Sequence, residues 1–308
     1  MAGGGGGTGA AAISGVGAPA RRREWWGLVF VAPVVIFFAV FFLYPLAQTA
    51  YLSLTDYDLL TAPRFTGLGN YTDLLHDAVF KKSLLTTGFY VVASTIPVCV
   101  FALALALVLQ RRGRIHGLIA AAFFLPVVIS DVVVAIVWKL MLGQFGPVNA
   151  GLTALGHDAA GFTSDPSLVP WSLVAITVWQ WTGWTMVIFL AGLRTIPRNL
   201  YDAARVDGAN SWQMFHGITL PLLRPTLFFV IAISVITGAQ SFGYQYVIGN
   251  GTGGPDSSTN VVALHIYRTA FKDLDAGHAA AMSMVLLVLL AGAIAIQMRV
   301  YPGELRKL

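Results

Sequence analysis

The chain has 308 residues, of which 56% are hydrophobic and 11% are charged. Because about a quarter of the residues in a soluble domain are charged, these proportions exclude a soluble globular protein and predict an all-α polytopic membrane protein. The single cysteine, Cys99, rules out a disulfide, a cysteine-based zinc site and a cysteine redox pair within one chain.

The N-terminal segment differs in composition from the rest of the chain. Residues 1–20 are rich in glycine and alanine, so we expect residues 1–24 to form a disordered cytoplasmic N-terminus. Arg21, Arg22 and Arg23 then precede an apolar run. That run is too long for the hydrophobic region of a signal peptide, so it is expected to stay in the protein as a membrane anchor.

Six apolar segments are long enough to cross a bilayer as helices, which takes about 20 residues each. The expected spans lie near Gly27–Ala50, Leu84–Leu109, Ile115–Leu142, Val169–Leu193, Leu222–Ile248 and Gly277–Met298. Prolines inside them predict kinks, which membrane helices tolerate; these are Pro33, Pro45, Pro97 and Pro126. Residues 25–300 are therefore expected to form one six-helix transmembrane domain, followed by a cytoplasmic tail at residues 301–308.

Basic residues are unequally divided between the two sides of this arrangement. Of the 19 lysines and arginines, 13 flank the termini or lie in or beside the loops after the second and fourth spans: Arg21, Arg22, Arg23, Arg111, Arg112, Arg114, Arg194, Arg198, Arg205, Arg224, Arg299, Arg306 and Lys307. Only 5 lie on the other side, namely Arg64, Lys81, Lys82, Arg268 and Lys272, while Lys139 lies within the third span. Because cytoplasmic loops carry the excess of basic residues, both termini and the loop at residues 194–221 are predicted to be cytoplasmic. This distribution explains the net charge of +5 without a nucleic-acid partner.

The loop at residues 194–221 has a local structure that the sequence specifies. Pro197 suits the first turn of a helix, because its missing N–H is not needed there. Arg198–Val206 is a good short helix, and Gly208 is placed to end it in the left-handed conformation. Ser211 is expected to cap a second short helix. Pro221 is expected to prevent simple continuation of that helix into the fifth span.

The same loop resembles the cytoplasmic segment by which permease subunits of bacterial ABC importers dock on their ATPase. Residues at the expected spacing are Asp202, Ala203, Ala204, Gly208, Ile218, Leu220 and Pro221. Asp202 replaces the usual glutamate, and the two alanines leave no bulk between the helix and a partner. The alternative is an ordinary helix–turn–helix between two spans. We refer to residues 194–221 as the coupling loop.

Two further segments resemble the outer loops of the maltose- and glycerol-phosphate-type carbohydrate permeases. They are Phe65–Tyr71 and Gly251–Pro255. The resemblance, closest to the first of the two permease subunits, implies the type I ABC importer permease fold in a bacterial cell membrane. It also implies four kinds of partner: a second similar permease, two ATPase subunits, an extracytoplasmic solute-binding protein and a substrate, which would be a sugar, an oligosaccharide, an amino sugar or a sugar-like solute such as glycerol phosphate. ATP and Mg²⁺ would be bound by the ATPases, so no cofactor, metal or catalytic residue is expected in this chain.

Polar and aromatic side chains cluster inside the fourth and fifth spans, where they are costly unless they face water or the bundle interior. Those singled out as the solute pathway are Trp179, Gln180, Trp181, Trp184, Gln240, Phe242, Tyr244 and Gln245. A sugar needs amide or hydroxyl partners for its hydroxyl groups and flat apolar surfaces for its C–H faces. The alternative role for these side chains is helix packing together with an aromatic belt at the membrane surface.

Asp131 is the only acid well inside a predicted span. We expect its carboxylate to bond a neighbouring span, with solute contact as the second possibility. Lys139 lies eight residues later, about 12 Å along a helix, which is too far for a direct ion pair. An ion-driven secondary transporter with Asp131 as proton carrier is the alternative function, but it leaves the coupling loop unexplained. The histidines show no metal-ligand spacing, and no nucleophile–base pair indicates an intramembrane enzyme.

Overall fold

The computed structural model describes residues 3–4, 20–110 and 113–300. The chain divides into two compact units, residues 1–48 and 49–308. The first unit contains α1 (Ala20–Phe38), the π-helix η1 (Ala39–Leu43) and the start of α2 (Tyr44–Leu52). Since α1 begins at Ala20, residues 20–24 are helical and were wrongly included in the disordered segment. Most of the expected N-terminal segment and the tail at residues 301–308 lie outside the described residues.

The second unit is built almost entirely of helices, with one short β-hairpin at its edge in which Thr55 pairs with Phe65. The hairpin strands are β1 (Thr55–Asp56) and β2 (Arg64–Phe65). The helices are α3 (Gly69–His76), α4 (Ala78–Leu109), α5 (Arg114–Phe124), η2 (Leu125–Val128), α6 (Asp131–Leu142), α7 (Pro147–Ala154), α8 (Val169–Arg194), α9 (Arg198–Val206), α10 (Ser211–Met214), η3 (Phe215–Thr219), α11 (Leu220–Leu222), α12 (Arg224–Ala239), α13 (Gly243–Ile248), η4 (Pro255–Ser257), α14 (Val262–Phe271) and α15 (Ala276–Val300).

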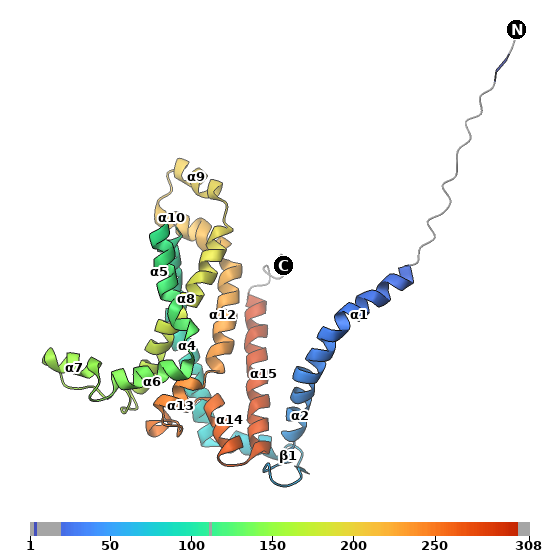
Figure 1. Ribbon diagram of the computed structural model, residues 1–308, viewed down its shortest axis with the longest axis vertical. Coiled ribbons are helices and arrows are strands. Elements are labelled where there is room, and N and C mark those ends of the chain that lie inside the picture. Colours follow the sequence, from blue (N-terminus) through green and yellow to red (C-terminus); the bar gives the residue numbers. More distant parts are fainter. Residues whose placement is uncertain (1–2, 5–19, 111–112, 301–308) are drawn as a thin grey trace. The chain divides into compact units, whose positions relative to one another are not determined.

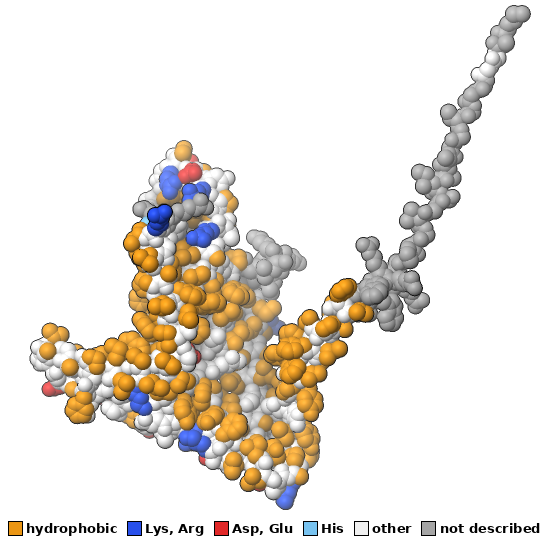
Figure 2. All heavy atoms as spheres, viewed as in Figure 1, with side chains coloured by type: hydrophobic (Ala, Val, Ile, Leu, Met, Phe, Trp, Pro, Cys, Tyr) orange, Lys and Arg blue, Asp and Glu red, His pale blue; other side chains and the backbone are white. Residues whose placement is uncertain are grey.

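Six helical segments of the described chain are long and apolar enough to cross a membrane, as the sequence predicts. They are Val29–Leu52, Ala78–Leu109, Asp131–Ala154, Val169–Arg194, Arg224–Ile248 and Ala276–Arg299. Large apolar side chains on their outward faces stay exposed, for example Val92 and Ile96 on α4 and Val288 on α15. The orange surface that follows the long helices of the second unit in Figure 2 is the surface that lipid would cover.

The third span was placed wrongly. Instead of one helix over Ile115–Leu142, the chain breaks at Ile129 and Ser130, whose backbones are extended. α5 packs against α8 and α4, whereas α6 and α7 turn away from that direction (Figure 1). Pro126 accounts for the break, because it lacks an N–H and forces the end of α5 into the tighter 3₁₀ turn η2. Arg114–Val128 is thus a short apolar helix separate from Asp131–Ala154.

The fifth span is also interrupted, between the end of α12 and the start of α13. Gln240, Ser241 and Phe242 are not helical, and Phe242 has φ −139° and ψ −42°. Non-helical backbone at membrane depth persists only where it is buried in protein or lines a water-filled cavity. The two interruptions therefore mark the interior face of the bundle.

The core of the second unit is the contact between α4 and α8. Buried residues recur along α4 at intervals of three or four, which gives the helix one interior stripe. Ala102 and Ala106 are fully buried in this stripe, against Met186 and Phe189 of α8. On its other side α8 meets α5 at Gly183, where any side chain would collide with the backbone of Phe123. Small residues at these crossings let membrane helices approach closely.

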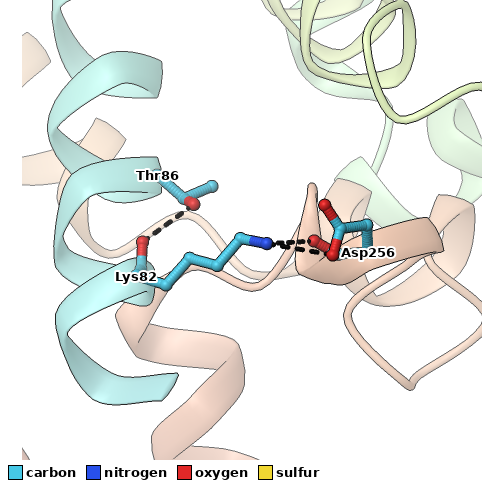
Figure 3. A network of polar contacts seen from close by, with 3 residues as sticks. All are labelled: Lys82, Thr86 and Asp256. Atoms are coloured by element: carbon cyan, nitrogen blue, oxygen red, sulfur yellow. Dashed lines mark hydrogen bonds and ion pairs between the residues drawn. The ribbon is translucent and has the colours of Figure 1, made fainter. Parts of the chain in front are cut away.

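The coupling loop lies at one end of the second unit, and β1, α13 and α14 lie towards the opposite, or far, end (Figure 1). There Lys82 at the start of α4 donates to the carbonyl of Asp256 (2.6 Å) and lies 3.2 Å from its carboxylate, which fastens the loop between α13 and α14 (Figure 3). His265 on α14 lies 3.6 Å from the carboxylate of Asp77. Burial lowers the pKa of His265, Asp77 opposes the shift, and Arg268 and His278 reinforce it.

Candidate functional site

The first half of the coupling loop matches the sequence-based expectation except at Pro197. That proline is the N-cap of α9 rather than part of its first turn, whereas Gly208 follows the helix with φ +82°, in the left-handed region. The Ala209 N–H donates to the Ala204 carbonyl (2.8 Å), which satisfies a carbonyl at the end of α9. The short helix and its glycine stop are confirmed.

The second half of the loop corrects two details. Ser211 is inside α10, and the capping residue is Asn210, which exchanges hydrogen bonds with Gln213 in a capping box (2.8 and 2.9 Å). Pro221 does not stop the helix, since the chain stays helical from α10 through α11. The π-helix η3 precedes the proline, and its wider turn shifts the hydrogen-bonding pattern so that the ring is accommodated.

The seven residues that carry the coupling motif divide by exposure. Asp202, Ala203 and Gly208 are exposed, while Ala204, Ile218, Leu220 and Pro221 are half-buried. Asp202 makes an exposed ion pair with Arg205 (2.7 Å). The structure thus presents one end of α9 to solvent and turns the Ile-x-Leu-Pro segment towards the bundle.

Two exposed apolar side chains of this loop were missed from the sequence. Val206 is 88% exposed and Trp212 is 69% exposed. The Trp212 ring stacks on Phe215, and Trp212 also lines a groove of about 950 Å³ between the loop and the ends of α4 and α8. The available signal was that each of these large apolar residues lies between two polar residues of the loop.

The base of the loop is joined tightly to the bundle. The hydroxyl groups of Tyr201 on α9 and Thr219 in η3 lie 2.9 Å apart and form a hydrogen bond. Gly192 near the end of α8 packs against Leu223 and Thr226, so that a side chain there would collide with both. Because these contacts are short and at least partly buried, a displacement of α9 would be transmitted to α8 and α12.

A cavity of about 490 Å³ lies where the two interrupted helices face α4 and α8. Its lining residues are Tyr90, Ser94, Thr95, Val98, Ser130, Asp131, Val132, Thr177, Trp181, Trp184, Thr185, Ile188, Val230, Ile233, Ser234, Thr237, Gly238, Gln240, Ser241, Phe242, Gly243 and Tyr244. Both breaks contribute, through Ser130 and Asp131 on one side and Gln240 to Phe242 on the other. Hydroxyl groups, one amide and aromatic rings therefore share one space.

A hydrogen-bonded network holds Asp131 at the wall of this cavity. Its Oδ1 atom accepts from the Tyr244 hydroxyl (3.1 Å) and from Gln180 Nε2 (3.2 Å), which also donates to the Ile129 carbonyl (3.0 Å). Tyr244 in turn accepts from Trp181 Nε1 (3.2 Å). Its single proton is shared between Asp131 and Gln180 Oε1 (2.7 Å). The expected bonding of Asp131 to neighbouring spans is confirmed.

A second network adjoins the break in the fifth span. The Tyr90 and Thr177 hydroxyls form a hydrogen bond at 2.5 Å, and Ser241 donates to Gln245 Oε1 at 3.0 Å. Gln245 is fully buried, and its Nε2 has no hydrogen-bond partner among the described residues. Gln245 is thus part of the support behind the cavity wall.

Lys139 fixes the far end of α13. Its Nζ donates to the Val247 carbonyl (2.6 Å) and to Asn250 Oδ1 (2.5 Å). The Val247 carbonyl is in the last turn of α13, where its backbone bond from the Asn250 N–H is long, at 3.4 Å. Lys139 therefore ties α6 to α13, and no ion pair with Asp131 is found in the part of the chain described.

The eight residues of the expected solute pathway do not all reach the cavity. Trp181, Trp184, Gln240, Phe242 and Tyr244 line it. Trp179 faces outward and packs edge-on against Trp138 with ring centroids 5.5 Å apart. Gln180 and Gln245 lie buried behind the wall. The lining from α4, including Tyr90 and Thr95, was missed, because nothing in the sequence of α4 says which face meets the break in the fifth span.

No group of three or more metal-binding side chains occurs within residues 20–110 and 113–300.

Comparison with known proteins agrees with these features. The family model described as "Binding-protein-dependent transport system inner membrane component" matches residues 78–302. The chain is similar to the probable ABC transporter permease protein YesP of Bacillus subtilis, at 37% identity over 87% of this chain and 88% of that protein. It is also similar to the lactose transport system permease protein LacF of Rhizobium radiobacter, at 35% identity over 86% and 90% of the two chains.

The fold is likewise similar to that of solved transporters. A crystal structure of a bacterial alginate ABC transporter, in complex with an alginate pentasaccharide-bound periplasmic protein, matches with a TM-score of 0.78. The match covers 90% of this chain and 94% of that chain at 22% identity. A second structure, of a bacterial ABC transporter involved in the import of the acidic polysaccharide alginate, gives a TM-score of 0.72 at 23% identity, over 90% of this chain and 96% of that chain.

Proposed function

This chain belongs to the family of binding-protein-dependent transport system inner membrane components, and from that membership we propose that it is the subunit through which an ATP-binding-cassette importer passes a carbohydrate. It is a multi-pass membrane protein and a non-catalytic transport component, like the permease subunits to which it is similar. A solute-binding protein on the outer side of the bacterial cell membrane delivers the substrate.

The cavity at the two helix interruptions is the observation that carries the proposal. Trp181, Trp184 and Phe242 offer flat apolar surfaces for the C–H faces of a sugar ring. Gln240, which is exposed, and Ser130 offer an amide and a hydroxyl group to sugar hydroxyls. Pockets that combine mostly apolar walls with a few convergent polar groups suit small-molecule ligands.

Energy for transport enters through the coupling loop. Moving a two-state equilibrium from 1:99 to 99:1 takes roughly 5.5 kcal/mol of differential affinity, more than sugar contacts can supply if the sugar is to be released. The complex has two partner ATPases, which bind the ATP and Mg²⁺. One of them contacts α9 and α10 of this chain and moves α8 and α12 through the contacts of Tyr201 and Gly192. A second permease of the same kind completes the pathway, and both termini and the coupling loop are cytoplasmic.

Reconstitution tests this proposal. Proteoliposomes that contain the complete transporter and its binding protein should accumulate sugar only with enclosed ATP, and ATPase-dead partner subunits should abolish uptake. Uptake that continues with dead ATPases and follows an imposed proton gradient would establish the ion-driven alternative. Asp131, the only carboxylate that could carry the proton there, is already bonded to Tyr244 and Gln180.

A further inference from the structure

The cavity has an unbalanced charge. Among its lining residues Asp131 is the only acid, and lysine, arginine and histidine are all missing from the lining. Lys139 is the nearest basic residue along the chain, but it lies about 12 Å further along α6 and is bound to Val247 and Asn250. Nothing within the described lining neutralises the carboxylate.

The carboxylate is also held in place. Both hydrogen bonds to Asp131, from Tyr244 and Gln180, reach Oδ1, so Oδ2 is the oxygen left for a solute. Gly243 packs closely against the Asp131 side chain, since a Cβ at residue 243 would lie 3.1 Å from the Asp131 Cβ. Asp131 is the first residue of α6, where the helix dipole favours negative charge.

We propose that Asp131 makes this permease selective for uncharged sugars over sugars with a carboxylate or phosphate group. Oδ2 accepts a hydrogen bond from a sugar hydroxyl, whereas an anionic group in the same space meets the negative charge of this carboxylate, which no basic side chain of the lining neutralises. This inference rests on the proposed function and adds the charge class of the substrate to it. Repulsion between the Asp131 carboxylate and a solute anion about 6 to 8 Å away, at an effective dielectric constant of about 20, would raise the dissociation constant of the anionic solute by roughly thirty- to one-hundredfold.

Direct binding to the complete transporter in lipid nanodiscs tests the proposal without the selectivity of the binding protein. The probes are radiolabelled galactotriose and trigalacturonate, which differ only in oxidation at C6, with maltotriose as a second neutral sugar. In wild type a neutral trisaccharide should bind at least tenfold more tightly than trigalacturonate. Asp131→Asn, which keeps the size and the Oδ1 acceptor, should bring the ratio to about twofold.

Two further variants make the outcome decisive. Asp165→Asn removes an acid that bonds Ser167 in the loop before α8 and does not line the cavity, so the ratio should stay as in wild type. Thr237→Lys, at an exposed lining position of α12, should shift preference towards trigalacturonate. Equal binding of neutral and acidic trisaccharides by wild type, or an unchanged ratio in Asp131→Asn, overturns the inference and leaves carbohydrate transport standing. Binding of neither class overturns both.

Discussion

Replacing Trp212 with alanine should weaken the attachment of the ATPase more than any other single change in the coupling loop. Trp212 is 69% exposed, and a tryptophan side chain buries about 150–250 Å² when it is covered. About 100–170 Å² is therefore open to a partner. At about 25 cal/mol per Å² this area corresponds to about 2.5–4 kcal/mol if docking covers it completely. Since part of this gain is lost in ordering the interface, we expect the dissociation constant to rise at least about tenfold.

The measurement is titration of the purified ATPase onto the permease pair in nanodiscs, followed by interferometry. Trp171→Ala is the matched control, because Trp171 is 56% exposed at the beginning of α8, away from the loop. It should leave the dissociation constant unchanged. A Trp212→Ala permease that binds ATPase within twofold of wild type would refute the assignment of this surface as the docking site.

Three other changes have measurable outcomes. Tyr244→Phe removes one hydrogen-bonding hydroxyl beside Asp131 and should raise KM for sugar several-fold, because one lost hydrogen bond costs about 0.5–1.5 kcal/mol. Gel filtration should show that the complex still assembles, and a wild-type KM would assign Tyr244 to packing alone. In a cysteine-free background, Ser257→Cys should react with an impermeant maleimide in intact cells and Asp207→Cys should not, and the opposite pattern would invert the topology. Because burial lowers the pKa of His265 from its ordinary 6.5, the unfolded state binds more protons, so the melting temperature should fall as pH drops from 7 to 5. His265→Asn should flatten that fall, and an equally steep fall would place the sensitive group elsewhere.

Local chemistry explains which parts of the fold were predictable. The lengths of the apolar runs determine the number of spans. Pro197 and Gly208 determine where α9 begins and ends, because their effects act within a few residues. The sequence flags Pro126 as a kink but does not show its size. Whether the chain bends slightly at Pro126 or changes direction completely depends on how α6 packs against the rest of the bundle. In this structure α6 is held by the contact of Lys139 with Val247.

The cavity was harder to predict than the spans, because its lining also depends on how the helices pack against one another. Polar residues in the fourth and fifth spans indicate an interior face, and five of the eight expected side chains line the cavity. Which side of the wall Gln180 and Gln245 occupy depends on the rotation of α8 and of α13 about their axes, and apolar spans with little amphipathic pattern do not encode that rotation. Tyr90 and Thr95 enter the site only because α4 packs across α8, a long-range contact that their neighbours in sequence do not specify.

The interruption of the fifth span allows its two halves to move separately. α13 packs on α6 and is fastened there by Lys139, whereas α12 packs on α4 and is joined to the coupling loop. A pull on the loop would therefore change the angle at residues 240–242 while α13 keeps its place. Such a hinge would open the proposed sugar site towards the loop end and leave the far end closed, so a single moving half-helix could keep the membrane sealed during each transport cycle.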